Sequence, residues 1–426
     1  MHATSNPVPA PAPVSGPAPA PAPVSASAPA AEHSPPSQDE GAARPSPATV
    51  TRLRLSAFRA LKECTVPLEP VTLLTGPSGS GKSSVLEAYE ALARLGGGEA
   101  LGEVFGRCAG GAASYVPCTA RPDAQGRRGF KFGCTVDGPA GPVRLDLAVQ
   151  AEPSLRIAGE RLTAADGRTL LSTALRDPSH SAVQAEWHSA GPGRVTRARL
   201  PADRLATALL PLRVAGGSKE EQRVLAAAEQ VVVALRAAFA CDPRPENMRD
   251  PVSAADRLLR GGCDNLAAVL RRTRMECTTR YGLLVAAVRA GCAGPVADLA
   301  SDVEDGGRDR GMLRALLVRG PDGPRTPLEW LGDGELRYTA LALVLLTGPG
   351  VLSMDPAQEV LPARQALTVL ADGLDRGLDV RQTRELLSLA VRMGERGHVR
   401  LLGAVGDAGA AVREAAPGVR LVDLGT

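Results

Sequence analysis

The amino-acid sequence predicts an α/β fold, and three observations support this prediction. Residues 51–58 alternate in hydrophobicity as a strand does, and a second apolar run covers 71–75. The glycine-rich segment GPSGSGKSS follows that run directly and leads into apolar residues at helical spacing, which stop at Gly96. From residue 311 onward, strand and helix patterns alternate again. We therefore expect 311–426 to complete a sheet that begins within residues 50–75.

The segment between these two parts changes its pattern along its length. It first predicts short antiparallel strands broken by glycine and proline. It then turns helical, where Ser218 and Glu221 form a capping-box pattern ahead of an apolar helical stripe. The expected strands are 130–136, 143–149 and 195–200, and further helices are expected from about 264 and over 280–290.

The C-terminal part is expected to contain strands and helices in alternation. The expected strands are 313–318, 351–354 and 399–405, and the expected helices are 336–346, 363–374 and 381–393. The chain therefore divides into a tail (1–48), a first part of the main fold (49–150), an inserted strand-and-helix region (151–310) and a second part of the main fold (311–426).

The tail and the overall composition exclude several classes of protein. Residues 1–48 hold 13 of the 36 prolines and almost no large apolar side chain, which predicts a disordered tail, either a spacer or docking arm or a dispensable extension. A net charge of +3 is far from that of a histone-like protein. The eight cysteines form no CxxC pair, and no apolar run is long enough to span a membrane. We expect a cytoplasmic protein without a membrane segment.

The glycine-rich segment fits the pattern G-x-x-x-x-G-K-[ST] between a strand and a helix. Backbone N–H groups of such a loop converge on phosphate oxygens, and the helix that follows adds its positive end. Lys82 is expected to reach the terminal phosphates of ATP, and the Ser83 hydroxyl to bind Mg²⁺. The alternative is an ordinary glycine-rich turn with an accidental lysine. The predicted ATP-binding residues are Gly76, Pro77, Ser78, Gly79, Ser80, Gly81, Lys82, Ser83 and Ser84.

A magnesium site of this kind also needs a carboxylate at the end of another strand. The best candidate by sequence is Asp355, because the apolar run 351–354 precedes it and a long helix precedes that run. The alternative is an Asp-Pro turn at the end of a strand.

Three stretches give a resemblance to a known family. TRLRLSAFRALKECTVPLEPVTLLTGPSGSGKSSVLEAYEALARL (51–95) resembles the opening of ABC-type ATPases of the RecF/SMC and OLD branch, often described as AAA-domain ATP-binding proteins. DNLAAVLRRTR (264–274) and LEWLGDGELRYTALALVLL (328–346) resemble later segments of the same proteins. The resemblance implies a P-loop NTPase fold in the form of an ABC-type head, split by the inserted region.

The resemblance also implies how ATP is held. In this family two heads sandwich ATP, and the signature loop of one head covers the phosphates bound to the other. The signature positions here are Gly332, Asp333, Gly334 and Glu335. They imply an ATP-dependent homodimer, whereas the alternative is an ordinary helix start capped by Asp333.

The sequence departs from the family at the positions that drive hydrolysis. Gly332 stands where the signature usually has serine, and Pro356 stands where a water-activating glutamate is usual. Glu359 lies nearby and is the candidate substitute base, although four residues separate it from Asp355. No histidine follows the strand 399–405, since His398 precedes it. Binding of ATP is therefore better supported than its turnover.

These observations predict a Mg-ATP-binding protein with slow or partner-stimulated hydrolysis, which the resemblance links to DNA repair, recombination or defence. DNA is an open partner, and the arginines of 271–274 are a candidate contact. The alternative function is a non-hydrolysing, nucleotide-controlled switch or scaffold that sets dimerisation and partner binding. A third possibility, the motor subunit of a membrane transporter, is disfavoured by the RecF-like opening.

Overall fold

The computed structural model describes residues 47–175, 182–190, 194–303, 311–354, 365–406 and 417–425. All of these residues belong to one compact unit, 45–426. Among them no helix is long and apolar enough to cross a membrane.

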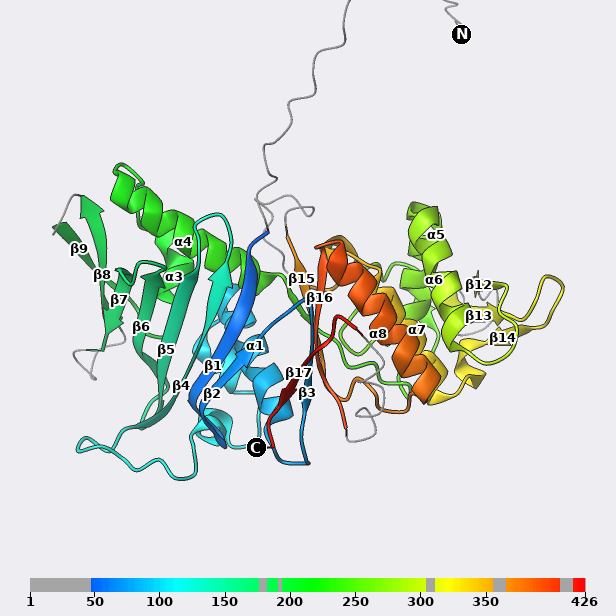
Figure 1. Cartoon of the computed structure of the whole chain (residues 1–426), viewed down its shortest axis with the longest axis horizontal. Coiled ribbons are helices and arrows are strands. Elements are labelled where there is room, and N and C mark those ends of the chain that lie inside the picture. Colours follow the sequence, from blue (N-terminus) through cyan, green and yellow to red (C-terminus); the bar gives the residue numbers. More distant parts are fainter. Residues whose placement is uncertain are drawn as a thin grey trace, which may run out of the picture. The chain divides into compact units, whose positions relative to one another are not determined.

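An eight-stranded antiparallel sheet forms one half of this unit (Figure 1). Its strands, in spatial order, are β2 (Leu61–Pro67), β1 (Thr49–Phe58), β4 (Arg128–Asp137), β5 (Val143–Glu152), β6 (Arg156–Ala164), β7 (Thr169–Ala174), β8 (Ala182–Ala190) and β9 (Arg194–Pro201). Alternation of apolar and polar residues gives the sheet one buried and one polar face. Leu53, Cys134 and Leu145 lie side by side on the buried face. The expected strands 130–136, 143–149 and 195–200 are thus confirmed.

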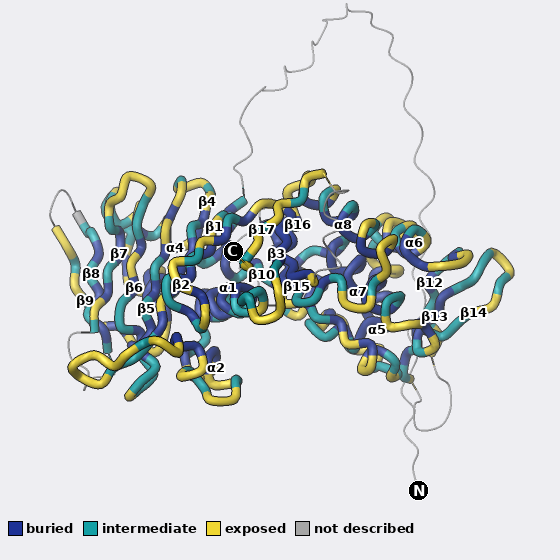
Figure 2. The backbone as a smooth tube through the Cα atoms, turned by 60° about the horizontal axis from the view of Figure 1, so that its bottom comes forward, coloured by how far each residue is buried: buried dark blue, intermediate teal, exposed yellow. Residues whose placement is uncertain are grey.

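A five-stranded parallel sheet forms the second layer, in the order β10 (Ala238–Ala240), β15 (Leu367–Ala371), β16 (Val399–Ala404), β3 (Val71–Thr75) and β17 (Arg420–Asp423). Every residue of β3 and of β15 is buried, as the dark tube in Figure 2 shows. Such continuous apolar runs are typical of parallel strands covered on both faces. Residues from 311–426 therefore complete the sheet around β3, as expected, while β1 and β2 belong to the antiparallel sheet.

Helices cover both faces of the parallel sheet. On one face α1 (Lys82–Gly96) packs against the sheet, and it shares a core with the antiparallel sheet and α4 (Lys219–Arg236). On the other face Val71 and Leu73 of β3 share a core with α7 (Asp333–Leu345) and α8 (Val380–Glu395). The Ser218 hydroxyl accepts a hydrogen bond from the Glu221 backbone N–H at the start of α4, as half of the expected capping box.

The remaining elements are smaller. Strands β11 (Val252–Ser253), β12 (Asp298–Val303), β13 (Met312–Val318) and β14 (Arg325–Pro327) form a separate antiparallel sheet. The other α-helices are α2 (Leu101–Phe105), α3 (Ala206–Leu209), α5 (Leu266–Glu276) and α6 (Thr278–Gly291), and 3₁₀ helices cover Gly111–Tyr115, Leu210–Leu212, Leu328–Trp330 and Pro349–Val351.

Two expected elements differ from the structure. The segment 351–354 is no strand of a sheet, because it follows a 3₁₀ turn and Leu352 forms only an isolated bridge with Leu259. The described part of the expected helix 363–374 contains β15 instead, since a run of β-branched and leucine residues is equally compatible with a buried strand. The expected division between residues 150 and 151 falls inside β5, and strands on either side of it pair in one sheet.

Candidate functional site

The candidate phosphate-binding loop connects the central strand β3 to helix α1. Gly81 is the N-cap of α1, so the first residues of the helix are Lys82 and Ser83. The Lys82 ammonium lies over the loop, where it donates hydrogen bonds to the Gly76 carbonyl at 2.5 Å and the Pro77 carbonyl at 3.0 Å. The Ser80 hydroxyl is buried and has no hydrogen-bond partner among the described residues. An unpaired buried hydroxyl and free helix N–H groups fit an anionic ligand with many acceptor oxygens.

The backbone of the loop explains its glycines. Gly76, Gly79 and Gly81 have φ values of 130°, 85° and 101°, in the region that side chains rarely adopt. At Gly81 space is also lacking, since an added Cβ would lie 2.7 Å from the Leu61 Cδ2 atom. At Gly79 nothing lies within 4 Å of such a Cβ. The loop conformation therefore depends on these residue types rather than on the lysine alone.

Because Gly79 has free space around it and Gly81 does not, alanine at each position gives a matched pair of variants for measuring the stability of the fold. We expect Gly79→Ala to lower the free energy of unfolding by about 1–2 kcal/mol through backbone strain alone. Gly81→Ala adds a clash in a packed site, and we expect a loss of about 2–4 kcal/mol. Urea unfolding of the two variants beside the parent chain measures both values. Equal losses for the two variants would contradict the close packing of Gly81 on Leu61.

The carboxyl ends of three parallel strands meet beside this loop. Ala371 of β15, Gly403 of β16 and Leu73 of β3 are register partners, so the residues that follow them share one edge of the sheet. In open α/β sheets ligands bind at this edge. Asp372, directly after β15, lines a cavity of about 560 Å³ together with Ser83 of α1. One carboxylate and one hydroxyl, both hard oxygen donors, therefore face the same space, which suits Mg²⁺ held with a phosphate.

The rest of the cavity wall comes from α1 and from two segments on either side of β11. Glu87 and Glu90 of α1 line it, and burial raises the pKa of the Glu90 carboxyl. The other lining residues include Cys241, Asp242, Arg244, Arg260 and Asp264. Among the described residues no cluster of three or more histidine, cysteine or carboxylate side chains forms a metal site by itself. A cation here would therefore need oxygen ligands from a bound phosphate as well.

Asp372 is a carboxylate of this cavity that the sequence analysis did not single out. The expected metal ligand Asp355 lies outside the described residues, as do Pro356 and Glu359. The signal for Asp372 was present, because the run Leu367–Ala371 is apolar and ends in an acid just as 351–354 does. A helical interpretation of 363–374 concealed it.

The segment after β15 links several parts of the site. Gly373 follows Asp372, and its carbonyl accepts a hydrogen bond at 3.1 Å from Arg337 of α7, whose side chain is 4% exposed. Arg337 also pairs with Asp242 at 3.2 Å. Asp375 accepts a hydrogen bond from the Gly406 N–H. Gly406 is the second residue after β16. One buried arginine thus ties α7 to the ends of β10 and β15.

The four predicted signature residues lie together at the start of α7. Gly332 is the N-cap, and no side chain caps the helix, so Asp333 is not the cap of the alternative interpretation. Asp333 instead forms an ion pair with Arg249 at 2.7 Å, and Glu335 forms one with Arg319 at 3.5 Å. Gly334 packs so closely that an added Cβ would lie 2.3 Å from the Gly377 carbonyl oxygen. Among the described residues that line the Ser83 cavity, none is a signature residue.

The arginines of 271–274 are largely engaged within the chain. Arg272 forms an ion pair with Glu276, and Arg274 forms one with Asp298. His398 lies directly before β16, not after it. The described residues that follow this strand, Val405 and Gly406, include no histidine.

Comparisons with known proteins give structural likeness only. No family model and no curated protein matches the chain. Similar solved structures include an SMC head bound to the C-winged helix domain of ScpA (13% identity, 84% of this chain and 90% of that one, TM-score 0.39) and the SMC head domain from Thermotoga maritima (12%, 87% and 92%, TM-score 0.37). A third is an SMC head with an extended coiled coil from Pyrococcus furiosus (10%, 87% and 92%, TM-score 0.40).

Because these TM-scores are low, the likeness carries no inference about function. The chain's own strand order and loop geometry define an α/β protein of the P-loop type. In that fold class a strand, a glycine-rich turn and a helix N-terminus form one anion-binding unit.

Proposed function

We propose that the chain binds Mg-ATP as an ABC-type head and hydrolyses it slowly or on stimulation by a partner. The observation that carries this proposal is the meeting of Lys82, Ser83 and Asp372 at the carboxyl edge of the parallel sheet. Lys82 would neutralise the terminal phosphates, while Ser83 and Asp372 would hold Mg²⁺. Mg²⁺ would polarise the phosphate oxygens and offset the charge of the transition state.

Weak turnover is expected from the residues that follow β15 and β16. Gly373 follows Asp372 and supplies no carboxylate to activate water, and Val405-Gly406 supplies no histidine. The same residues favour the alternative function, a nucleotide-controlled switch that does not turn over. Glu359 stays the candidate substitute base.

An ATP-dependent homodimer is part of the proposal. No side chain caps the backbone N–H groups at the start of α7, and among the described residues that line the Ser83 cavity none belongs to Gly332–Glu335. We propose that this loop contacts the phosphates bound to a second copy, since a helix N-terminus is suited to an anion.

The polar face of the eight-stranded sheet supports the DNA part of the proposal. Strand register places Gly133, Asp146, Arg161, Ser172, Glu186 and Arg197 in one row across this face. Its basic residues include Arg52, Arg54, Lys62, Lys131, Arg144, Arg161, Arg197 and Arg199. Small residues, including Gly133, Gly159 and Ser172, lie between these cations. Exposed cations that small residues leave accessible suit the phosphate backbone of a nucleic acid.

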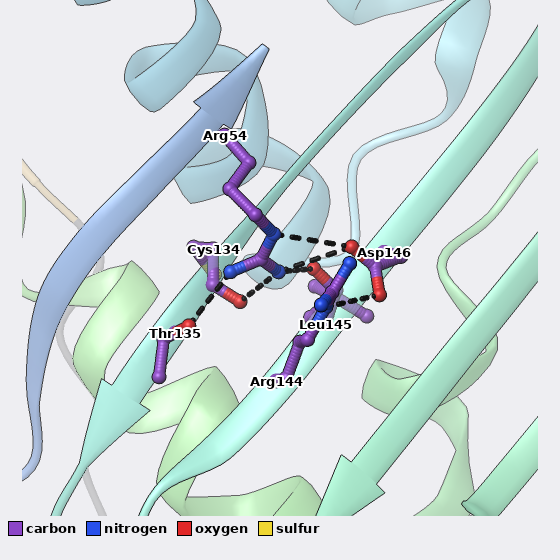
Figure 3. A network of polar contacts seen from close by, with 6 residues as sticks. All are labelled: Arg54, Cys134, Thr135, Arg144, Leu145 and Asp146. Carbon is purple, nitrogen blue, oxygen red and sulfur yellow. Dashed lines mark hydrogen bonds and ion pairs between the residues drawn. The ribbon is translucent and has the colours of Figure 1, made fainter. Parts of the chain in front are cut away.

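Only part of this charge is neutralised within the chain. Arg54 donates hydrogen bonds to Asp146, to the Thr135 hydroxyl and to two backbone carbonyls, as Figure 3 shows. Asp146 also pairs with Arg144 at 2.7 Å. In contrast, Lys131 and Arg161 are exposed and have no ion-pair or hydrogen-bond partner among the described residues.

Steady-state phosphate release by the full chain with Mg-ATP, with and without DNA, tests the proposed function. We expect slow turnover that DNA increases, with ATP binding measured on the same samples. Lys131→Glu with Arg161→Glu should keep the basal rate and lose the DNA effect, because two phosphate contacts are removed. Glu359→Gln should slow turnover if Glu359 is the substitute base.

Three other results would change this conclusion. Tight ATP binding without turnover, with or without DNA, would establish the switch. Unchanged turnover in Glu359→Gln would exclude that residue as the base. A chain that binds no ATP would refute the proposal as a whole.

A further inference from the structure

Two buried thiols face each other beside the Ser83 cavity. The Sγ atoms of Cys241 and Cys263 are 3.9 Å apart, and the residues are 2% and 0% exposed. Cys241 also lines the cavity itself. A disulfide has an S–S length of about 2.05 Å, so a relative shift of about 2 Å would join the two sulfurs.

The two cysteines lie on neighbouring backbone segments that already run side by side. The Asp242 N–H donates to the Gly261 carbonyl at 2.9 Å, and the Arg244 N–H donates to the Gly262 carbonyl at 3.0 Å. Cys263 has a φ of 56°, a left-handed conformation that is uncommon for a residue with a side chain. The backbone therefore holds the two side chains together at a site where strain is already present.

We propose that Cys241 and Cys263 form a reversible disulfide that controls nucleotide binding at this cavity. The control of ATP binding rests on the proposed function, whereas the disulfide itself does not. Cys134 is also buried, but it lies in strand β4 of the antiparallel sheet and does not line this cavity.

The chemistry needs a two-electron oxidant, and a hydroperoxide small enough to enter the cavity meets this need. One thiol, as its thiolate, attacks the O–O bond of hydrogen peroxide and becomes a sulfenic acid while the other oxygen leaves as water. The second thiol attacks that sulfur, the S–S bond forms and a second water leaves. Two thiols are oxidised and one peroxide is reduced to two waters. A dithiol reverses the reaction by exchange.

The disulfide would change the walls that hold the nucleotide. Closing the two sulfurs moves the segments that carry Asp242, Arg244 and Arg260, all of which line the cavity. Asp242 would also be drawn from its ion pair with Arg337, which ties α7 to the site. We therefore expect the oxidised chain to bind ATP more weakly, and by linkage bound Mg-ATP should hold the pair in its reduced form.

The rate of oxidation should depend on pH. The neighbouring Cys241 thiol and burial raise the pKa of the Cys263 thiol well above its ordinary value. Because only the thiolate attacks peroxide, oxidation that begins at Cys263 should keep accelerating as the pH increases beyond 9.

To test this inference, the full chain is treated with hydrogen peroxide, with and without saturating Mg-ATP. Disulfides are then mapped by mass spectrometry of tryptic peptides. We expect a link between the peptides of Cys241 and Cys263, formed at least fivefold more slowly with Mg-ATP. ATP affinity should fall at least tenfold on oxidation and recover with dithiothreitol. Cys134→Ser is the matched control and should behave like the parent chain. For Cys241→Ala and Cys263→Ala, the affinity of each variant should be the same with and without peroxide treatment.

The outcomes separate this inference from the proposed function. Absence of the linked peptide after peroxide treatment would overturn the inference even if the reduced chain binds ATP. A linked peptide with unchanged ATP affinity would overturn the control of binding. A linked peptide in a reduced chain that never binds ATP would refute the proposed function and the control, and leave the disulfide as a structural feature. If the alanine variants fail to fold, the linked peptide of the parent chain decides.

Discussion

Replacing Lys82 by alanine is expected to lower the affinity for Mg-ATP by about 10- to 100-fold. The Lys82 ammonium donates hydrogen bonds to the Gly76 and Pro77 carbonyls, which hold it over the loop. It is therefore within reach of any phosphate that the loop binds. A hydrogen bond between charged groups contributes about 1.5–3 kcal/mol, which corresponds to this range. Isothermal titration of the full chain with ATP and Mg²⁺ measures the effect.

The control for this variant is Lys62→Ala. Lys62 is one of only four lysines in the chain, and it is exposed on β2 rather than placed at the loop. Each variant removes one positive charge from the net charge of +3. A general effect of charge would therefore weaken ATP binding in both variants. Equal affinities of Lys82→Ala and the parent chain would show that the loop does not bind phosphate through its lysine. Thermal unfolding of both variants verifies that they fold.

Replacing Asp372 by asparagine is expected to remove most of the contribution of Mg²⁺ to ATP binding. Asparagine keeps the shape of the side chain and loses the negative charge that a hard cation requires. We expect the affinity for ATP with Mg²⁺ to fall at least tenfold, whereas the affinity with EDTA should stay close to that of the parent chain. Titrations with and without Mg²⁺ separate the two contributions.

Asp355→Asn is the matched variant, because it removes the same charge from the other apolar run that ends in an acid. Asp372 lines the Ser83 cavity, so we expect Asp355→Asn to keep the effect of Mg²⁺. Loss of the Mg²⁺ effect in Asp355→Asn alone would restore the sequence-based assignment. Loss in both variants would mean that each carboxylate contributes to the cation site.

Local patterns predicted the candidate loop because its chemistry lies within one short segment. The strand Val71–Thr75, the glycines and Lys82 are adjacent in the sequence, so residue type and spacing were enough. The same holds for α4, α7 and α8, whose expected ranges are confirmed by their helices. Each of these elements is determined largely by its own apolar periodicity.

Contacts between distant segments were harder to predict. Two apolar runs end in an acid, and both precede residues that break the strand, so no local signal separates them. The choice depends on which run joins the sheet, and Leu367–Ala371 joins it by pairing with β10 and β16. The polar face of the antiparallel sheet also depends on register across several strands.

The sequence by itself determined that a phosphate-binding type of loop joins a buried strand to a helix, because backbone conformation and helix start are local properties. Only the tertiary structure decided that Asp372 lines the Ser83 cavity and that Cys263 lies 3.9 Å, sulfur to sulfur, from Cys241 of the same cavity. The physical reason is that strand pairing brings together residues hundreds of positions apart, and its free energy comes from burial shared by the whole sheet rather than from any one segment.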